Sequence, residues 1–479
     1  MQEGDKVFES KAFTIETRLN QRYNAEIIEY AKGYNVLYGK MLRYAWHRYN
    51  NGGTFNMKKS KFNTILQTTF SVSKRIANSV IYEVEGLYKA LYQLKWYEYG
   101  QLKGKIDKKY KKIEKMSKIV FAIREKAMKS GFTSSSLWYY RKLKVDIFYA
   151  KQKINRLKQK QKNLLKEILS KDLHICFGSK KLFYAQFNLK ENNLTSHKVW
   201  LEHFRRARDN RSLYIGSMDE SRCNQILQLT PMVNAGKGNR FSIQLRKNTK
   251  AREYARGFCT FKYMDGFLVN TIIKQNHGVT YRILFRGRKC YLQAMVTLDK
   301  NTDNCKTRSS YGTIGLDYND GFIELAETNE TGNLIRLQHI GLEFHGTGDA
   351  ATSEIRNVVS KIVDYALLTG KDIVIEDLDF RKTKAETDQA KSNEGKDYNR
   401  MIHAFDYSRY KKSFENCCFR RDVTLREVNP AYTSKTAEQK YCNRKKLVIH
   451  QGAAYVIARR GQGYVDKYIK PKKKTKKSA

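Results

Sequence analysis

The stretch TIGLDYNDGFIELAETNETGNLIRLQHI, residues 313–340, decides the fold of the C-terminal part of the chain. Two apolar runs that contain acids, TIGLDYND and GFIELAETN, precede the turn ETGN and a third run, NLIRLQHI. Short apolar runs separated by Gly and Asn are typical of antiparallel strands joined by turns. We therefore expect a three-stranded meander with Asp317 inside its first strand.

A helix and a further strand are expected after the meander. SEIRNVVSKIVDYALLTG (353–370) has apolar residues at helical spacing, and KDIVIEDLDF (371–380) is a buried-type strand that ends in acids. In a strand–helix–strand crossover the second strand lies parallel to the first, and the carboxyl ends of both meet at one edge. This arrangement lets Glu376 approach Asp317.

A third element of the site is expected near the C-terminus. After the strand VTLREVNP (423–430), the segment LVIHQGAAYVIARRG (447–461) is predicted to form a helix with His450, Ala453 and Ala454 on one face. The small alanines let this helix lie close to the sheet, which directs His450 toward the two acids. A histidine on an apolar face is more often a packing residue, and that reading stays open.

Two carboxylates that face each other repel unless cations lie between them. Magnesium favours oxygen ligands and keeps several waters, and two such ions can activate water and stabilise the leaving oxygen in phosphodiester hydrolysis. We predict Asp317, Glu376 and His450 as catalytic and metal-binding residues, with two Mg²⁺ ions for which Mn²⁺ can substitute. The alternative is that the acids are ordinary surface residues at strand ends.

The rest of the chain predicts an α+β multidomain protein. Residues 26–174 are expected to be helical and to include a hairpin that turns at GFTSSS (131–136). Residues 1–25 and 175–310 are expected to form a β-rich domain. Its antiparallel strands are predicted from the alternating runs RFSIQLRK, GFLVNTIIK, VTYRILFRG and CYLQAMVTL.

Charge indicates the class of partner. The 479 residues include 92 Lys+Arg and 47 Asp+Glu, a formal net charge of +45, which favours a polyanion, with nucleic acid ahead of an anionic membrane surface. No apolar stretch is long enough to span a membrane, and eight cysteines without a C-x-x-C pair predict no structural zinc. We expect a soluble, intracellular protein that faces nucleic acid and has a disordered basic tail at 467–479.

Four segments carry a family resemblance: GLDYND with Asp317, IEDLDF with Glu376, EVNPAYTSKT (427–436) and HQGAAYVIARRG (450–461). They stand in the order of RuvC motifs I, II and III, and they resemble the transposon-encoded TnpB nucleases and the related type V CRISPR effectors. The resemblance implies an RNase H-like (RuvC) nuclease domain at 311–380 and 400–466 with a lid loop at 381–399. Upstream it implies a wedge domain with a helical recognition insertion.

The implied activity is RNA-guided DNA cleavage. Guide RNA and target double-stranded DNA would be the partners, and the cut would lie beside a short DNA recognition motif. Basic and aromatic residues such as Trp46 are candidates for stacking on unpaired bases, and Arg459 and Arg460 are candidates for contacting a phosphate. The oligomeric state stays open.

Two departures from the family pattern leave alternatives. His450 stands where the family usually has an Asp, and AEQKYCNRKKLVI (437–449) replaces the usual four-cysteine zinc finger. One alternative is a nuclease-impaired, guide-directed protein that acts by occupying DNA. Another is a transposase that transfers strands itself without RNA.

Overall fold

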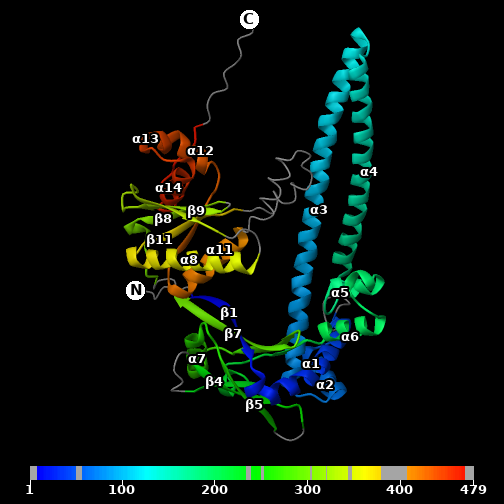
Figure 1. The fold of residues 1–479 in the computed structure, drawn as a ribbon, viewed down its shortest axis with the longest axis vertical. Coiled ribbons are helices and arrows are strands. Elements are labelled where there is room, and N and C mark those ends of the chain that lie inside the picture. The colour runs from blue at the N-terminus through cyan, green and yellow to red at the C-terminus, as the bar shows by residue number, and fades with distance from the viewer. Residues whose placement is uncertain are drawn as a thin grey trace. The chain divides into compact units, whose positions relative to one another are not determined.

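The computed structural model describes residues 8–49, 57–232, 239–249, 253–301, 305–319, 321–343, 348–378 and 407–469. The chain divides into two compact units, an N-terminal unit of Ser10–Leu298 and a C-terminal unit of Met1–Glu9 with Asp299–Ala479 (Figure 1). The predicted lid loop and all but three residues of the predicted basic tail lie outside the described residues. Among the helices that the structure describes, none is long and apolar enough to cross a membrane.

The helical part of the N-terminal unit contains the predicted hairpin. Its helices are α1 (Gln21–Tyr49), α2 (Lys59–Phe70), α3 (Lys74–Ser130) and α4 (Ser134–Ser170). Figure 1 shows α3 and α4 side by side along their length. Gly131 ends α3 with a positive φ of 75°, and the Thr133 hydroxyl caps α4 by accepting a hydrogen bond from the Ser136 N–H at 3.3 Å. The hairpin prediction is confirmed.

Two sheets make up the β-rich part of this unit. The first has the strand order β1-β7-β6-β2, with β1 (Phe8–Leu19), β7 (Lys289–Asn301), β6 (Thr280–Arg286) and β2 (Arg211–Tyr214). The second comprises β3 (Leu227–Met232), β4 (Arg240–Arg246) and β5 (Tyr254–Thr260). Two short helices, α5 (Lys180–Tyr184) and α6 (His197–Arg208), precede β2. The described pairings of β6 and β4 with their neighbours are antiparallel, as predicted.

One predicted strand of this region is wrong. The run GFLVNTIIK lies in a helix, α7 (Asp265–Lys274). Its buried residues, Leu268, Thr271 and Ile272, follow the i, i+3, i+4 spacing of a helix face, while Ile273 is exposed. A short apolar run fits both a strand and a helix, and here packing of the helical face decided between them.

The C-terminal unit is built on a five-stranded sheet with the order β10-β9-β8-β11-β12. Its strands are β8 (Thr313–Asn319), β9 (Phe322–Thr328), β10 (Leu334–Gly341), β11 (Asp372–Glu376) and β12 (Leu425–Val428). β8, β9 and β10 form an antiparallel meander, and β11 lies parallel to both β8 and β12. The predicted meander and the predicted neighbour strand are both present.

Helices cover both faces of this sheet (Figure 1). On one face, α8 (Asp349–Thr369) and α11 (Tyr407–Arg421) pack against residues such as Leu316 and Ile375. On the other, α14 (Ile449–Gly461) packs with α12 (Thr433–Ala437) and α13 (Asn443–Lys445) nearby. Ala326 of β9 and Ala454 of α14 share the small core there. The carboxyl ends of β8 and β11 therefore lie at one edge, between the two helical layers.

Backbone lies directly on backbone where α14 crosses β8. A Cβ at Gly315 would overlap the carbonyl oxygen of Ala454 and the nitrogen of Ala458. Beside it, the Thr313 hydroxyl donates to the Ala458 carbonyl at 2.7 Å. Because only glycine leaves room for this approach, Gly315 fixes the distance of α14 from the sheet.

Replacing Gly315 by Ala is expected to lower the stability of the protein by about 1–3 kcal/mol, because the added methyl group meets backbone that cannot rotate away. Thermal unfolding of the full chain measures the change. Gly341→Ala is the matched control, since Gly341 is in the same sheet and has no heavy atom near its Cβ position. Equal unfolding temperatures for the two variants would contradict the close contact.

Candidate functional site

Three polar residues from three neighbouring strands form a row on the sheet face that α14 covers. Asp317 of β8 stands directly opposite Glu324 of β9, and Glu324 stands opposite His339 of β10. Residues directly opposite each other in antiparallel strands share a face and are close neighbours. Gly315, two residues before Asp317, is against α14, which places the row on that face.

Glu376 extends the row onto a fourth strand. In the parallel pairing of β11 with β8, Val374 is the partner of Gly315, so Glu376 and Asp317 each follow two residues later. Equal steps along parallel strands keep both side chains on one face and at one level. We call the four residues His339, Glu324, Asp317 and Glu376 the polar row.

His450 reaches the polar row from the first turn of α14. Its Nδ1 is 3.0 Å from Oδ2 of Asp317, and its side chain is 43% exposed, whereas that of Asp317 is 12% exposed. The same carboxylate oxygen accepts a hydrogen bond from Nδ2 of Asn319 at 2.8 Å. The imidazole N–H is the donor to the carboxylate, so His450 and Asn319 together orient Asp317.

Glu376 is the strongly perturbed acid of the row. Burial raises the pKa of its carboxyl to about 7, and the nearby charge of Asp317 acts in the same direction. The Thr433 hydroxyl donates to Glu376 Oε1 at 2.5 Å, and this bond and the charge of Arg460 oppose the rise in pKa. The Tyr407 hydroxyl donates to the Glu376 backbone carbonyl. The Thr433 hydrogen bond and the charge of Arg460 therefore do not fully offset the free-energy cost of burying the ionised Glu376 carboxylate.

Glu324 and His339 were not predicted from the sequence. Oε1 of Glu324 is 2.7 Å from Nδ1 of His339, while Oε2 is buried and has no hydrogen-bond partner among the described residues. The Phe322 ring lies 5.2 Å from the His339 ring and 5.3 Å from the His450 ring, between centroids. The sequence signal that could have found Glu324 is its place within the apolar run FIELA (322–326), because charged residues are almost never fully buried unless they are paired.

The structure brings together the three residues that the sequence predicts. Asp317 and His450 are in contact, and Glu376 is near enough to Asp317 for their charges to interact. Across the described ranges, however, no group of three His, Cys, Asp or Glu side chains is arranged to hold a metal ion. His450 bonds to Asp317 through Nδ1, and its role as a metal ligand stays a prediction.

The donor set still fits Mg²⁺. This ion is usually bound through one or two carboxylates and retains several waters, so it does not need three converging side chains. Asp317 and Glu376 supply two oxygen donors at one edge of the sheet. The raised pKa of Glu376 marks a carboxylate that a nearby cation would stabilise in its charged form.

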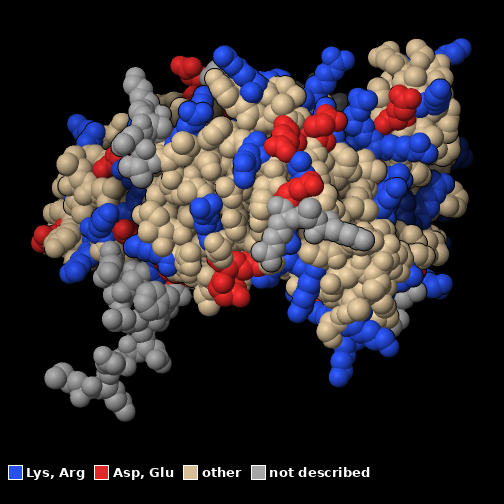
Figure 2. All heavy atoms as spheres, turned by 90° about the horizontal axis from the view of Figure 1, so that it is seen from below, with Lys and Arg blue, Asp and Glu red and all other residues tan. Residues whose placement is uncertain are grey.

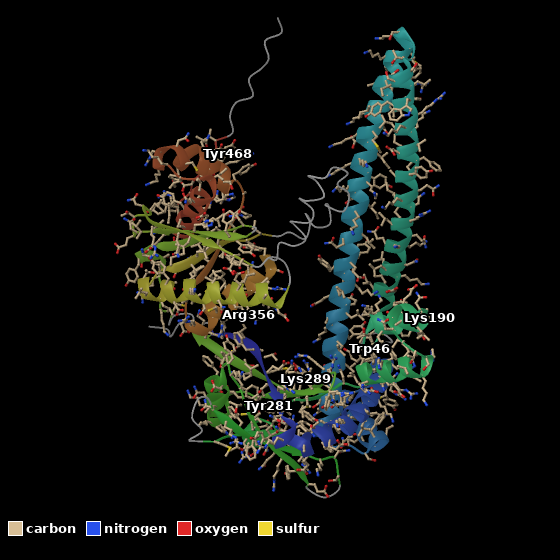
Figure 3. All side chains as sticks on the ribbon, in the orientation of Figure 1. Trp46, Lys190, Tyr281, Lys289, Arg356 and Tyr468 are labelled. Carbon is tan, nitrogen blue, oxygen red and sulfur yellow. The ribbon has the colours of Figure 1, made fainter. Side chains whose placement is uncertain are left out.

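The other side chains proposed for substrate contacts have partners within the protein. Arg459 donates from Nε to Asp466 Oδ2 and from Nη1 to the Gly332 carbonyl, both at 2.8 Å. Arg460 donates to the carbonyls of Asn429 at 2.5 Å and Ala431 at 3.0 Å, which fixes the loop before α12. Trp46, labelled in Figure 3, is buried and packs against other aromatic rings of its unit.

Comparisons with known proteins add only distant likenesses. No protein-family model matches the chain, and no curated protein matches it. Among solved structures, a CRISPR-Cas12f ternary complex matches at 12% identity and a TM-score of 0.22, covering 94% of this chain and 98% of that chain. A Cas12i1–crRNA binary complex matches at 10% identity and a TM-score of 0.23, covering 83% of this chain and 50% of that chain. A Cas12i1 R-loop complex before target DNA cleavage matches at 8% identity and a TM-score of 0.25, covering 78% of this chain and 61% of that chain. At these TM-scores the likeness assigns neither a fold nor an activity.

Glu376→Gln is expected to stabilise the metal-free protein at pH 8. The folded-state pKa of about 7 lies above the ordinary value of 4.5, so the stability that the protonated carboxyl provides is complete below about pH 4.5 and is lost as the pH rises through 7. Removing the charge should recover up to about 3 kcal/mol at pH 8 and almost nothing at pH 4.

Denaturant unfolding in EDTA at both pH values measures this difference. Asp377→Asn is the matched control, because Asp377 is exposed and its Oδ1 is 3.0 Å from Nζ of Lys411, so its loss should cost about 0–1 kcal/mol. A Glu376→Gln protein that is less stable than wild type at pH 8 would show that the carboxylate is compensated in the folded chain.

Proposed function

We propose that the protein is a metal-dependent, RNA-guided DNA endonuclease of the TnpB type, with one RuvC-like site. The observation that carries the proposal is the convergence of Asp317 and Glu376 at the carboxyl ends of adjacent strands, where the pKa of Glu376 is raised to about 7 and His450 contacts Asp317. Acids with perturbed pKa values concentrate at functional sites.

The topology of the C-terminal unit supports an RNase H-like domain. The first three strands form an antiparallel meander, β11 then adds parallel to β8, and α14 crosses β8 at Gly315. Asp317, Glu376 and His450 come from the first strand, the fourth strand and this helix, in the order in which the RuvC motifs carry their residues. This placement supports the three residues that the resemblance implies.

In this proposal each side chain of the site has its own role. Asp317 and Glu376 would hold Mg²⁺, which supplies an activated water and stabilises the leaving oxygen when bound. Thr433 holds one oxygen of Glu376 in place. His450 donates to Asp317 and so orients its carboxylate. Because imidazole can also ligate a metal or transfer a proton, His450 is compatible with an active site.

The distribution of positive charge supports nucleic-acid partners. Figure 2 shows a face of the molecule on which Lys and Arg side chains clearly outnumber Asp and Glu. On the α3–α4 hairpin, burial and then the charges of Lys153, Lys112 and Lys108 lower the pKa of Lys109. Crowded ammonium groups repel each other, and a bound phosphate backbone relieves that repulsion. We propose guide RNA and double-stranded target DNA as these partners.

Magnesium-dependent cutting tests the proposal. The protein, expressed with its own flanking DNA, is purified through high salt and its RNA is sequenced; one dominant species with a fixed part and a variable end is the expected guide. DNA that matches the variable end should be cut by wild type and by Asp377→Asn, but not by Asp317→Ala or Glu376→Gln. Heterogeneous RNA, or cutting that survives in Glu376→Gln, would contradict the proposal.

The same assay separates the alternatives. Guide-dependent DNA binding without cutting by wild type would identify a protein that acts by occupancy. Strand-transfer products from transposon ends in the absence of RNA would identify a transposase. Either result replaces the nuclease proposal.

His450→Ala is expected to reduce the rate of cutting, because Asp317 loses the imidazole that holds one of its oxygens. His450→Asp is expected to keep or raise the rate, since a carboxylate at this position can contact the metal directly. Single-turnover cleavage rates in Mg²⁺ measure both effects. Rates equal to wild type in both variants would make His450 a packing residue.

A further inference from the structure

We infer that Glu324 and His339 extend the candidate site, and that His339 binds a backbone phosphate of the DNA strand that is cut. The identity of the strand rests on the proposed function. The contact itself is inferred from the geometry of a second carboxylate–imidazole pair, which lies beside the pair formed by Asp317 and His450.

The pair is built to hold an imidazole in one orientation. The Glu324 side chain is only 5% exposed, and its Oε1 lies 2.7 Å from Nδ1 of His339, whose own side chain is 58% exposed. Phe322 packs beside the ring. With Nδ1 bound to Glu324 and the ring supported, Nε2 is the polar atom of His339 left to bind a ligand from solvent.

The free donor of a protonated His339 suits an anionic ligand. An imidazolium donates from both nitrogens, so it can bridge Glu324 through Nδ1 and a phosphate oxygen through Nε2. Asp317, Glu324 and Glu376 all bring negative charge to the same sheet face, which repels a DNA backbone. A donor on the neighbouring strand offsets this repulsion at the point where the backbone enters.

The alternative ligand, a metal ion, is not favoured by the same residues. The pair has one carboxylate where Asp317 and Glu376 together have two, and Oε1 of that carboxylate already faces Nδ1 of His339. A single carboxylate and a half-exposed imidazole make a weak cation site. The same two groups suffice to position one donor for a phosphate.

The position of the pair predicts which phosphate is bound. His339 is on β10, two strands from Asp317 on β8, and neighbouring strands lie about 5 Å apart, so the two Cα positions are separated by about 10 Å across the sheet. At the rise of duplex DNA that span corresponds to about three nucleotides, and to fewer in an extended single strand. The phosphate bound by His339 should therefore lie within about three nucleotides of the cut.

Substitutions at His339 separate the phosphate contact from a structural role. His339→Asn keeps a donor near the Nδ1 position for Glu324 but removes Nε2, whereas His339→Gln places an amide nitrogen near the Nε2 position. His339→Ala removes both. Gln338→Ala is the matched control, because Gln338 is adjacent on β10 but lies in the groove on the opposite face, beside α8.

The experiment measures the affinity of the full-length protein, with its co-purified RNA, for a single-stranded DNA oligonucleotide. Neutral methylphosphonates replace single phosphates at each of the three positions on either side of the cut. One position should lower wild-type affinity about tenfold or more. In His339→Ala that position should have no further effect, since the contact is already lost. His339→Gln should retain more affinity than His339→Asn.

The inference would be overturned if His339→Ala bound the oligonucleotide as tightly as wild type does. It would also be overturned if each methylphosphonate lowered the affinity of both proteins by the same factor at every position. Wild-type affinity in His339→Asn would overturn it as well, because it would reduce the residue to a partner of Glu324. If the protein binds but does not cut DNA, the proposed function fails, and methylphosphonates scanned along the whole oligonucleotide still decide the contact. If wild type cuts and Asp317→Ala does not, a normal His339→Ala protein overturns only this inference.

Discussion

The backbone contact between α14 and β8 at Gly315 is the constraint on which the rest of the C-terminal unit depends. Without a side chain at Gly315, the helix approaches until the Thr313 hydroxyl bonds to the Ala458 carbonyl. This fixes both the height and the rotation of α14 over the sheet. His450, in the first turn of the helix, consequently meets Asp317, two residues beyond the contact on β8. A thicker interface would separate Asp317 from His450.

The acids of the C-terminal unit fall into two classes that the sequence does not distinguish. Glu327 of β9 is buried on the α8 face, where Nζ of Lys371 and the hydroxyl of Tyr365 each lie 2.6 Å from its carboxylate. It is compensated, as buried charges in stable proteins are. On the α14 face, Glu376 has no such cation bonded to it in the described structure, and its pKa is raised accordingly, while Oε2 of Glu324 is buried without a hydrogen-bond partner there. Buried acids without full compensation destabilise a fold, and acids with perturbed pKa values concentrate at functional sites, which is why we propose this edge of the sheet as the site.

Two carboxylate–imidazole pairs lie side by side at this edge. The Phe322 ring lies close to both imidazole rings, and each imidazole contacts a different acid. In both pairs the acid is the more buried partner: Asp317 is 12% and Glu324 5% exposed, whereas His450 is 43% and His339 58% exposed. The two pairs therefore repeat one arrangement, a buried carboxylate bonded to a solvent-facing imidazole.

The sequence by itself determined those features that depend on neighbours along the chain. The meander from 313 to 340, the helical hairpin and the acids at the ends of two strands follow from local periodicity and turn residues, and they are present. Periodicity did not settle GFLVNTIIK, a run short enough to fit strand or helix, and tertiary packing made it α7. Only the tertiary structure places Glu324 and His339 beside Asp317 and His450. Turn residues set the register of the β9–β10 hairpin, whereas the sheet face that α14 covers is set by packing between residues far apart in the sequence.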